Sequence, residues 1–168
     1  MKRLFFISLI TIVLSENSVA QKIVTSFWDC QFGLTSEQVY QNLTKAELSP
    51  IVGDDAIYLQ NNSVYGISFQ VIGLKFTAED AFYNIFGYNK FDNKQDANAE
   101  FNNALARLKE RYPNVQTMSR PEGCLKLYAY ADADAGTAFS LGLYKSDEGK
   151  FFVRLNVFSD YLLKRANN

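Results

Sequence analysis

Apolar and polar residues alternate most clearly along residues 64–71, where the pattern predicts a β-strand with one buried and one solvated face. One face carries Tyr65, Ile67, Phe69 and Val71, and polar residues or glycine stand between them. From the next residue onward the apolar positions move by one place. A pleated strand can do this only through a bulge or a tight turn, which we place near Gly73. Residues 56–60 and 82–88 predict further strands, with a turn at residues 61–62.

A helix is predicted over residues 36–47. Thr35 and Gln38 stand three residues apart and form the capping box that satisfies free backbone amides at a helix start. Leu34 and Val39 flank this cap as a hydrophobic staple. Such a cap stabilises a helix by about 1 kcal/mol, so it fixes where the helix begins and performs no chemistry.

A second helix is predicted to begin at Asp92 or Asn93 and to end at Tyr112. Pro113 sets this end, because proline disfavours helical conformation in the residue before it. The apolar positions recur three and four residues apart, as one face of a helix requires. They are Phe101, Ala104, Leu105, Leu108 and Tyr112.

The last third of the chain predicts strands again. They cover residues 114–118, 125–131, 138–144 and 151–158, with glycine-containing turns between the last three. The order of elements is helix then strands, and it can be read as occurring twice. No parallel crossover is required, so we expect an α+β fold in which two helices pack on antiparallel β-sheet.

Residues 1–20 have the three zones of a secretory signal peptide. Lys2 and Arg3 give a basic start, residues 4–14 are apolar, and a polar tail ends in small residues at Ala20. The apolar run is too short to cross a bilayer, which needs about 20 residues. We therefore expect an exported protein, periplasmic or extracellular, whose mature residues 21–168 form a single domain with no transmembrane segment.

Charge and cysteine content narrow the function. The chain has 17 Lys and Arg against 18 Asp and Glu, a balance that does not favour nucleic acid as a partner. It has two cysteines, Cys30 and Cys124, and an exported protein keeps disulfides. We predict that these two are paired, which would close a loop of about 90 residues and add about 4 to 5 kcal/mol of stability. Two free buried thiols are the alternative.

The residue types exclude most familiar catalysis. The chain has no histidine, which removes Ser-His-Asp and Cys-His catalysis and histidine metal sites. Its nine glycines form no phosphate-binding loop. Paired carboxylates remain at residues 54–55, 79–80, 132 and 134, and 147–148, but all lie in predicted loops or turns. We therefore expect no enzyme, no metal site and no cofactor.

The C-terminal strands suggest a binding surface. If their aliphatic residues point toward the helices, a face rich in aromatic residues and arginine points away from them. Tyr, Phe and Arg are enriched at protein interfaces. The candidate partner-binding residues are Tyr128, Tyr130, Tyr144, Phe152, Arg154 and Phe158. The competing interpretation is that another part of the chain covers this face.

The segment Gly33-Leu-Thr-Ser-Glu-Gln-Val39 resembles the helix start of small exported bacterial domains of the β-lactamase-inhibitor-protein and BamE kinds. The resemblance covers seven residues, with the helix and the following antiparallel strands in the same order. It implies a non-enzymatic α+β protein whose sheet face or edges contact another protein. Only this architecture carries over, and no binding residue does.

Three functions follow, in order of preference. The first is an exported protein-binding or envelope-associated module without catalytic activity. The second is a small-molecule carrier in which the aromatic residues of segment 65–91 line a cavity. The third is a carboxylate-dependent hydrolase acting on glycans, which would need two acidic side chains about 5 to 10 Å apart in a cleft.

Overall fold

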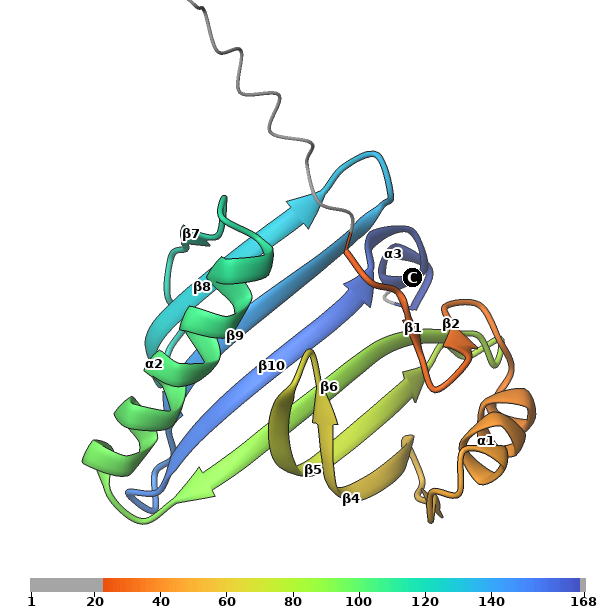
Figure 1. Cartoon of the computed structure of the whole chain (residues 1–168), viewed down its shortest axis with the longest axis horizontal. Coiled ribbons are helices and arrows are strands. Elements are labelled where there is room, and N and C mark those ends of the chain that lie inside the picture. The colour runs from red at the N-terminus through yellow and green to blue at the C-terminus, as the bar shows by residue number, and fades with distance from the viewer. Residues whose placement is uncertain (1–22, 167–168) are drawn as a thin grey trace, which may run out of the picture.

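The computed structural model describes residues 23–166, and strands predominate in it. Strands account for 45% and helices for 23% of the described residues, so the expected α+β class is wrong and the protein is mostly β. One eight-stranded antiparallel sheet forms its body, and a two-stranded sheet precedes α1 (Figure 1). The predicted signal peptide, residues 1–20, lies outside the described residues.

The elements follow in the order of the chain. The helices are α1 (Ser36–Lys45), α2 (Lys94–Arg111) and α3 (Asp160–Ala166). The small sheet consists of β1 (Ser26–Phe27) and β2 (Cys30–Gln31). The large sheet consists of β3 (Ile51–Val52), β4 (Ala56–Val64), β5 (Ile67–Phe76), β6 (Phe82–Phe91), β7 (Gln116–Thr117), β8 (Cys124–Asp132), β9 (Thr137–Lys145) and β10 (Phe151–Ser159).

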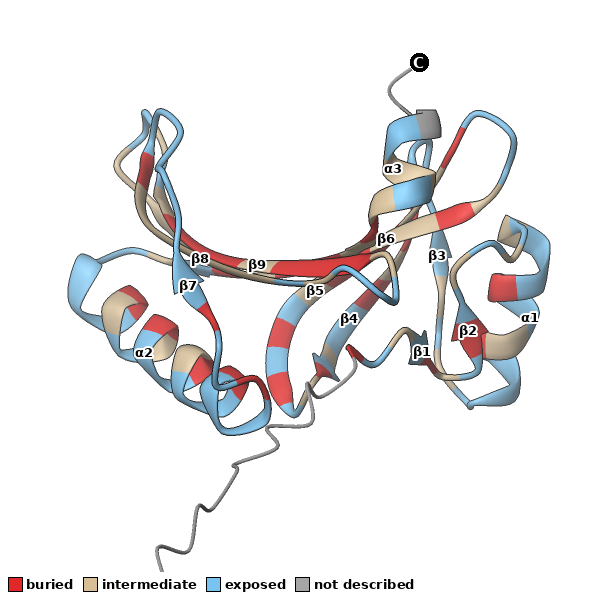
Figure 2. Cartoon of the chain, turned by 90° about the horizontal axis from the view of Figure 1, so that it is seen from above, coloured by how far each residue is buried: buried red, intermediate tan, exposed pale blue. Residues whose placement is uncertain are grey.

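Two meanders of four strands form the large sheet. Its spatial order is β3-β4-β5-β6-β10-β9-β8-β7, so the meanders meet where β6 pairs with β10. Helices α1 and α2 lie on the same side of this sheet, and α3 lies on the opposite side at one end (Figure 2). The side without α1 and α2 is concave in this view, and we call it the open face.

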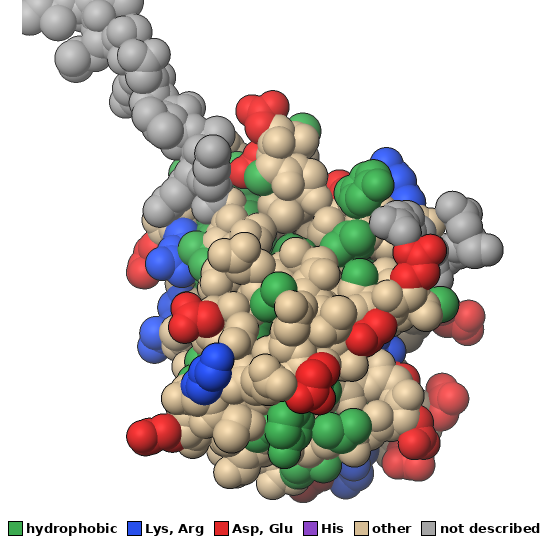
Figure 3. Space-filling view, turned by 90° about the vertical axis from the view of Figure 1, so that its right-hand side faces the viewer, with side chains coloured by type: hydrophobic (Ala, Val, Ile, Leu, Met, Phe, Trp, Pro, Cys, Tyr) green, Lys and Arg blue, Asp and Glu red, His purple; other side chains and the backbone are tan. Residues whose placement is uncertain are grey.

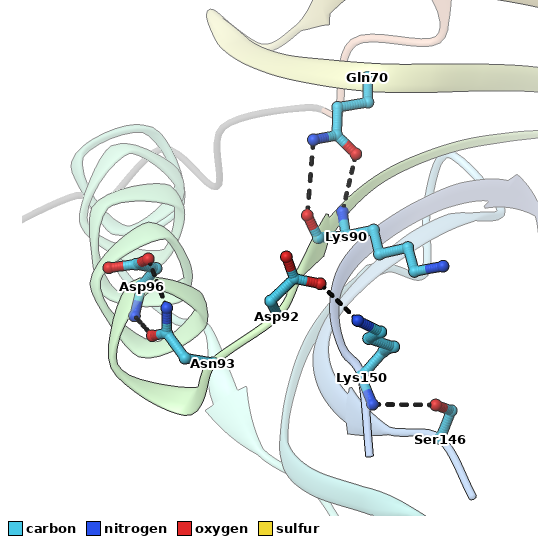
Figure 4. A network of polar contacts seen from close by, with 7 residues as sticks. All are labelled: Gln70, Lys90, Asp92, Asn93, Asp96, Ser146 and Lys150. Carbon is cyan, nitrogen blue, oxygen red and sulfur yellow. Dashed lines mark hydrogen bonds and ion pairs between the residues drawn. The ribbon is translucent and has the colours of Figure 1, made fainter. Parts of the chain in front are cut away.

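Both longer helices begin where the sequence places them. Thr35 caps α1, and its capping box with Gln38 is present as predicted. Asn93 caps α2, because its side-chain oxygen accepts a hydrogen bond from the backbone N–H of Asp96 at 2.9 Å (Figure 4). The residue after α2 is Tyr112, which precedes Pro113 as expected.

The core lies between the sheet and the two longer helices. Its largest fully buried side chains include Phe82 and Phe101, together with an aromatic group around Tyr112. The Tyr112 ring stacks on Tyr130 with centroids 5.4 Å apart and contacts Phe139 at 5.1 Å. This group joins the end of α2 to β8 and β9, so it fixes how the helix sits on the sheet.

The turn between β4 and β5 lies at Tyr65 and Gly66, not at residues 61–62 as predicted. Both residues have positive φ, 54° and 73°, as a two-residue type I′ turn requires. Tyrosine rarely adopts this conformation. Here the centroid of its ring lies 5.8 Å from that of Tyr112. Its hydroxyl donates a hydrogen bond to the carbonyl oxygen of Val24 at 2.9 Å. Tertiary contacts therefore stabilise a turn that local sequence does not indicate.

Strand β5 pairs with β6 only from Val71 onward, so the sheet forks between them. Side-chain amides span the fork. Gln70 accepts from the backbone N–H of Lys90 at 2.9 Å (Figure 4), and Asn89 accepts from the N–H of Gln70 at 2.7 Å. Asn89 also donates to the carbonyl oxygen of Ser68 at 2.8 Å. The fork lies just before the residues where the apolar pattern shifts by one place. The pairing of β5 with β6 is also irregular between Lys75 and Phe76, close to Gly73, where a bulge or a tight turn is predicted.

The predicted disulfide is not formed, because Cys30 and Cys124 are free and buried in separate places. Cys30 lies on β2 beside α1, where its Sγ donates to the carbonyl oxygen of Val39 at 3.7 Å. Cys124 begins β8, where its Sγ donates to the carbonyl oxygen of Lys126 at 3.1 Å. The strands that carry the two residues belong to different sheets, so the fold gives them no common position.

Both thiols are expected to be unreactive in the folded protein at neutral pH and reactive in denaturant without reductant. Burial raises the pKa of both thiols, that of Cys30 from 9.0 to about 11 with a smaller contribution from the charge of Asp29. A chromogenic disulfide reagent should therefore detect two thiols only after unfolding. Finding none in the unfolded protein would contradict the free cysteines.

The raised pKa of Cys30 also makes the free energy of unfolding depend on pH. The folded state favours the neutral thiol, so this stabilisation is complete below the unfolded pKa of 9.0 and decreases as pH rises toward about 11. Denaturant curves should show Cys30→Ala losing less stability between pH 9 and 11 than the unchanged protein does. Parallel curves would show that Cys30 is not the group responsible.

Candidate functional site

The open face is built from every second residue of the six long strands. The register places Tyr88 of β6, Arg154 of β10 and Gly142 of β9 side by side in one row. The next row runs through Phe86 and continues with polar or small residues on β10 and β9. The open face thus combines aromatic, aliphatic, basic and small side chains, which include Tyr58, Lys75, Phe86, Tyr88, Lys90, Leu127, Ala129, Ser140, Gly142, Tyr144, Phe152, Arg154, Asn156 and Phe158.

Two aromatic rings on this face lie across glycines. A Cβ atom on Gly142 would come within 2.4 Å of the Tyr144 ring, and one on Gly73 would come within 2.3 Å of the Phe86 ring. Real Cβ atoms do not approach so closely, so each ring occupies the space that a side chain would fill. The glycines therefore let the rings lie down on the sheet and keep the open face shallow.

Four side chains enclose a hollow of about 280 Å³ on the open face. They are Tyr88, Tyr144, Phe152 and Arg154. The Tyr88 and Phe152 rings meet edge to face with centroids 6.2 Å apart. Burial raises the pKa of Tyr144, while the charge of Arg154 acts in the opposite direction. The hollow thus has aromatic walls and a guanidinium group close to the Tyr144 hydroxyl.

Arg154 is held in place by its neighbours on the open face. Its Nε donates to the side-chain oxygen of Asn156 at 3.0 Å, and its guanidinium carbon lies 5.0 Å from the centroid of Phe86. Asn156 in turn contacts Ser140, with 3.4 Å between the amide nitrogen and the hydroxyl oxygen. These contacts orient an arginine that remains exposed to solvent.

A second charged group lies toward the outer strands of the first meander. Lys75 forms a 3.0 Å ion pair with Asp55 and lies 5.7 Å from the centroid of Phe86. Asp55 also accepts a 2.6 Å hydrogen bond from the Tyr58 hydroxyl. That hydrogen bond, followed by the contact with Lys75, holds the pKa of Asp55 below its ordinary value. The positive charge of Lys75 is therefore already balanced within the protein.

The predicted partner-binding residues are divided between the two faces of the sheet. Tyr144, Phe152, Arg154 and Phe158 lie on the open face, as expected. Tyr128 and Tyr130 lie on the helix side. The ring centroids of Tyr128 and Phe101 are 5.9 Å apart, and the Tyr130 ring stacks on Tyr112. Their placement with the other four is thus incorrect.

A register shift in β8 explains the error. The pairing with β9 is irregular between Cys124 and Lys126, and beyond it Tyr128 pairs with Leu141. Leu141 is fully buried under α2, so Tyr128 shares its face. The prediction assumed that aliphatic residues alone would point toward the helices. Instead, Tyr128 and Tyr130 of β8 pack against aromatic residues of α2 and its C-terminal end.

Sequence reasoning missed the part of the open face that lies on the first meander. Tyr88 and Lys90 flank the hollow and its rim, and Phe86 supports Arg154. Strand β6 gave little signal, because Gly87 and Asn89 occupy its helix side where apolar residues would mark alternation. In the same segment, which the carrier hypothesis places around a cavity, Phe82 lies in the core.

Other surfaces offer weaker candidates. A polar crevice of about 490 Å³ lies between the β4–β5 turn and α2, where Arg107 already donates to the carbonyl oxygen of Gly66 at 3.2 Å. Figure 3 shows the side of the molecule that lies at the right of Figure 1, and there acidic, basic and hydrophobic side chains are dispersed. Asp80 and Asp132 each accept a backbone N–H in a turn or cap. These features are typical of ordinary surface.

Two further classes of site are absent from the described part of the chain. Within residues 23–166, no three His, Cys, Asp or Glu side chains gather where they could hold a metal ion. Over the same residues, no helix has the length and apolar content needed to span a bilayer. The open face therefore remains the most developed candidate site.

Comparison with known proteins adds no relative. No protein-family model matches the chain, and neither the curated proteins nor the solved structures gave a match.

Proposed function

We propose that this protein is an exported, non-enzymatic binding protein that contacts another protein through the open face. One observation supports this most directly: a face without α1 and α2 carries half-buried aromatic rings around an exposed arginine. Tyrosine, phenylalanine and arginine are the types enriched in the buried parts of protein interfaces. Export rests on the sequence of residues 1–20 alone.

The size of the open face is compatible with a specific interface. Its six long strands have nine or ten residues each. With strands about 4.8 Å apart and about 3.3 Å per residue, this face covers roughly 700 Å² in projection. Each partner in a standard interface contributes about 800 Å². One globular domain seated in the concave face would use most of it.

The rigidity of this face also favours binding. The rings of Phe86 and Tyr144 lie across glycines, and Arg154 is held by Asn156. Side chains that are already ordered lose less conformational entropy when a partner binds. The open face is thus arranged before any partner arrives.

The purified protein is expected to capture a specific partner from envelope extract, and the Phe152→Ala/Arg154→Ala variant is expected to lose it. Both side chains border the hollow, and Arg154 is exposed. Exposed or half-exposed positions affect stability little, so the melting temperature should change by only about 4 °C. Affinity capture followed by mass spectrometry measures the first effect, and thermal unfolding measures the second.

A matched control comes from the outer side of α2. Lys94 and Asn102 are exposed there, and their replacement by alanine removes one cation and one polar side chain far from the hollow. The Lys94→Ala/Asn102→Ala variant should retain the partner. Equal capture by the Phe152→Ala/Arg154→Ala variant would show that the open face is not the binding surface.

A further inference from the structure

The hollow on the open face contains hydrogen-bond donors without acceptors. Arg154 uses Nε for Asn156, and the described side chains place no acceptor on its two terminal nitrogens. Among residues 23–164, the ion pairs are Lys75 with Asp55 and Lys150 with Asp92. Arg154 is therefore a fixed cation that presents two parallel N–H groups to a ligand.

The walls of the hollow strengthen any charge pairing inside it. The rings of Tyr88, Tyr144 and Phe152 line the space next to Arg154. Electrostatic attraction grows as the surrounding dielectric falls. A planar guanidinium also matches a carboxylate, because two parallel N–H groups can donate to its two oxygens.

The charges on the open face are complementary to an acidic partner. Lys90 lies 5.9 Å from the Phe152 centroid at the rim of the hollow and forms no ion pair with a described side chain. Lys75 is balanced by Asp55. Among the described side chains, Arg154 and Lys90 are thus two cations around the hollow without a carboxylate partner. Two cations would release few counterions from a nucleic acid backbone and so would add little affinity for it.

We infer that the hollow receives an acidic side chain of the partner protein, whose carboxylate accepts two hydrogen bonds from the terminal nitrogens of Arg154. This inference rests on the proposed function and specifies the chemistry of the partner. A volume of about 280 Å³ is large enough to admit a glutamate or aspartate side chain. Ser140, one row further along β9, is a small residue on the same face.

The test uses defined peptides with the full chain. Acetyl-Gly-Glu-Gly-amide and its glutamine counterpart differ only in the charge of the central side chain. Nuclear magnetic resonance should show saturable shifts at the Arg154 Nε–H and around Phe152 with the glutamate peptide, with a Kd in the millimolar range. The glutamine peptide should bind about fivefold more weakly, because an exposed charge pair contributes modestly.

Variants separate charge from shape. Arg154→Gln should bind both peptides equally, and Arg154→Lys should keep part of the preference because it keeps the charge and loses the paired donors. Thermal unfolding confirms that both variants fold. Equal binding of the two peptides to the unchanged protein would overturn the inference. Acetate binding as tightly as the glutamate peptide would overturn it too, since that indicates a site for small anions.

The inference and the proposed function fail in different ways. Partner capture that depends on Phe152 and is unaffected by Arg154→Gln would leave the function standing and overturn the acidic anchor. Glutamate preference without any partner lost in the Phe152→Ala/Arg154→Ala variant would overturn the function. Loss of the same partner in Arg154→Gln alone, together with glutamate preference, would support both.

Discussion

Replacing Phe139 by alanine is expected to lower the free energy of unfolding by about 3 to 5 kcal/mol, the largest effect of any single change considered. Phe139 lies on β9 with no exposed surface. The centroid of its ring lies 5.1 Å from that of Tyr112, 5.9 Å from that of Tyr130 and 6.4 Å from that of Tyr65. Truncation removes these contacts and leaves a cavity between the sheet and the end of α2.

The measurement is urea denaturation, with Phe152→Ala as a matched control. Both changes remove a phenylalanine ring from a strand of the same meander, but Phe152 is half-buried on the open face. We expect this control to lose about 1 kcal/mol, in line with substitutions at partly exposed positions. A similar loss in both variants would contradict the assignment of the core to the helix side.

Replacing Gly87 by alanine is expected to cost about 3 kcal/mol, whereas the same change at Gly73 should cost about 1 kcal/mol. A Cβ atom on Gly87 would lie 2.5 Å from the ring of Phe69, which is buried in the core and cannot move away. A Cβ atom on Gly73 would meet the outer end of the Phe86 ring, which is covered on the open face by the flexible side chains of Lys75 and Arg154 and can shift with them. The two glycines thus differ in how far the neighbouring ring can move to relieve the clash.

Double variants test this explanation. Adding Phe86→Ala to Gly73→Ala should remove most of the cost of the glycine change, because the clashing ring is gone. Adding Phe69→Ala to Gly87→Ala should also remove the clash. That double variant should still be less stable, because it loses the buried Phe69 ring. Additive losses in the Gly73 and Phe86 pair would show that the rings do not lie across the glycines.

The sequence predicted most helices and strands but not the fold class. Capping residues and Pro113 gave the ends of α1 and α2, because these signals act within a few residues. The strands run longer than the pattern indicated: β6 extends to Phe91, beyond the predicted end at residue 88. Longer strands shifted the balance from α+β to mostly β.

The misplaced features depend on contacts between distant segments. The turn at Tyr65 is stabilised by Tyr112 and Val24, which no local pattern connects to it. The faces of Tyr128 and Tyr130 depend on the irregular pairing at the start of β8. Alternation within a strand shows which residues share a face. The pairing register between strands decides whether that face lies on the helix side or on the open face. The candidate residues on β9 and β10 therefore lie on the open face, whereas those on β8 lie on the helix side.

The position of β10 has a consequence for how the protein is made. This strand is the last of the sheet to be synthesised, yet it lies between β6 and β9. Until it emerges, the first meander ends in an unpaired β6 and the second in an unpaired β9. Sheets joined by distant strands fold slowly, and unpaired edges invite aggregation. The sheet thus cannot close before β10 has been synthesised, so the two meanders stay unjoined until then.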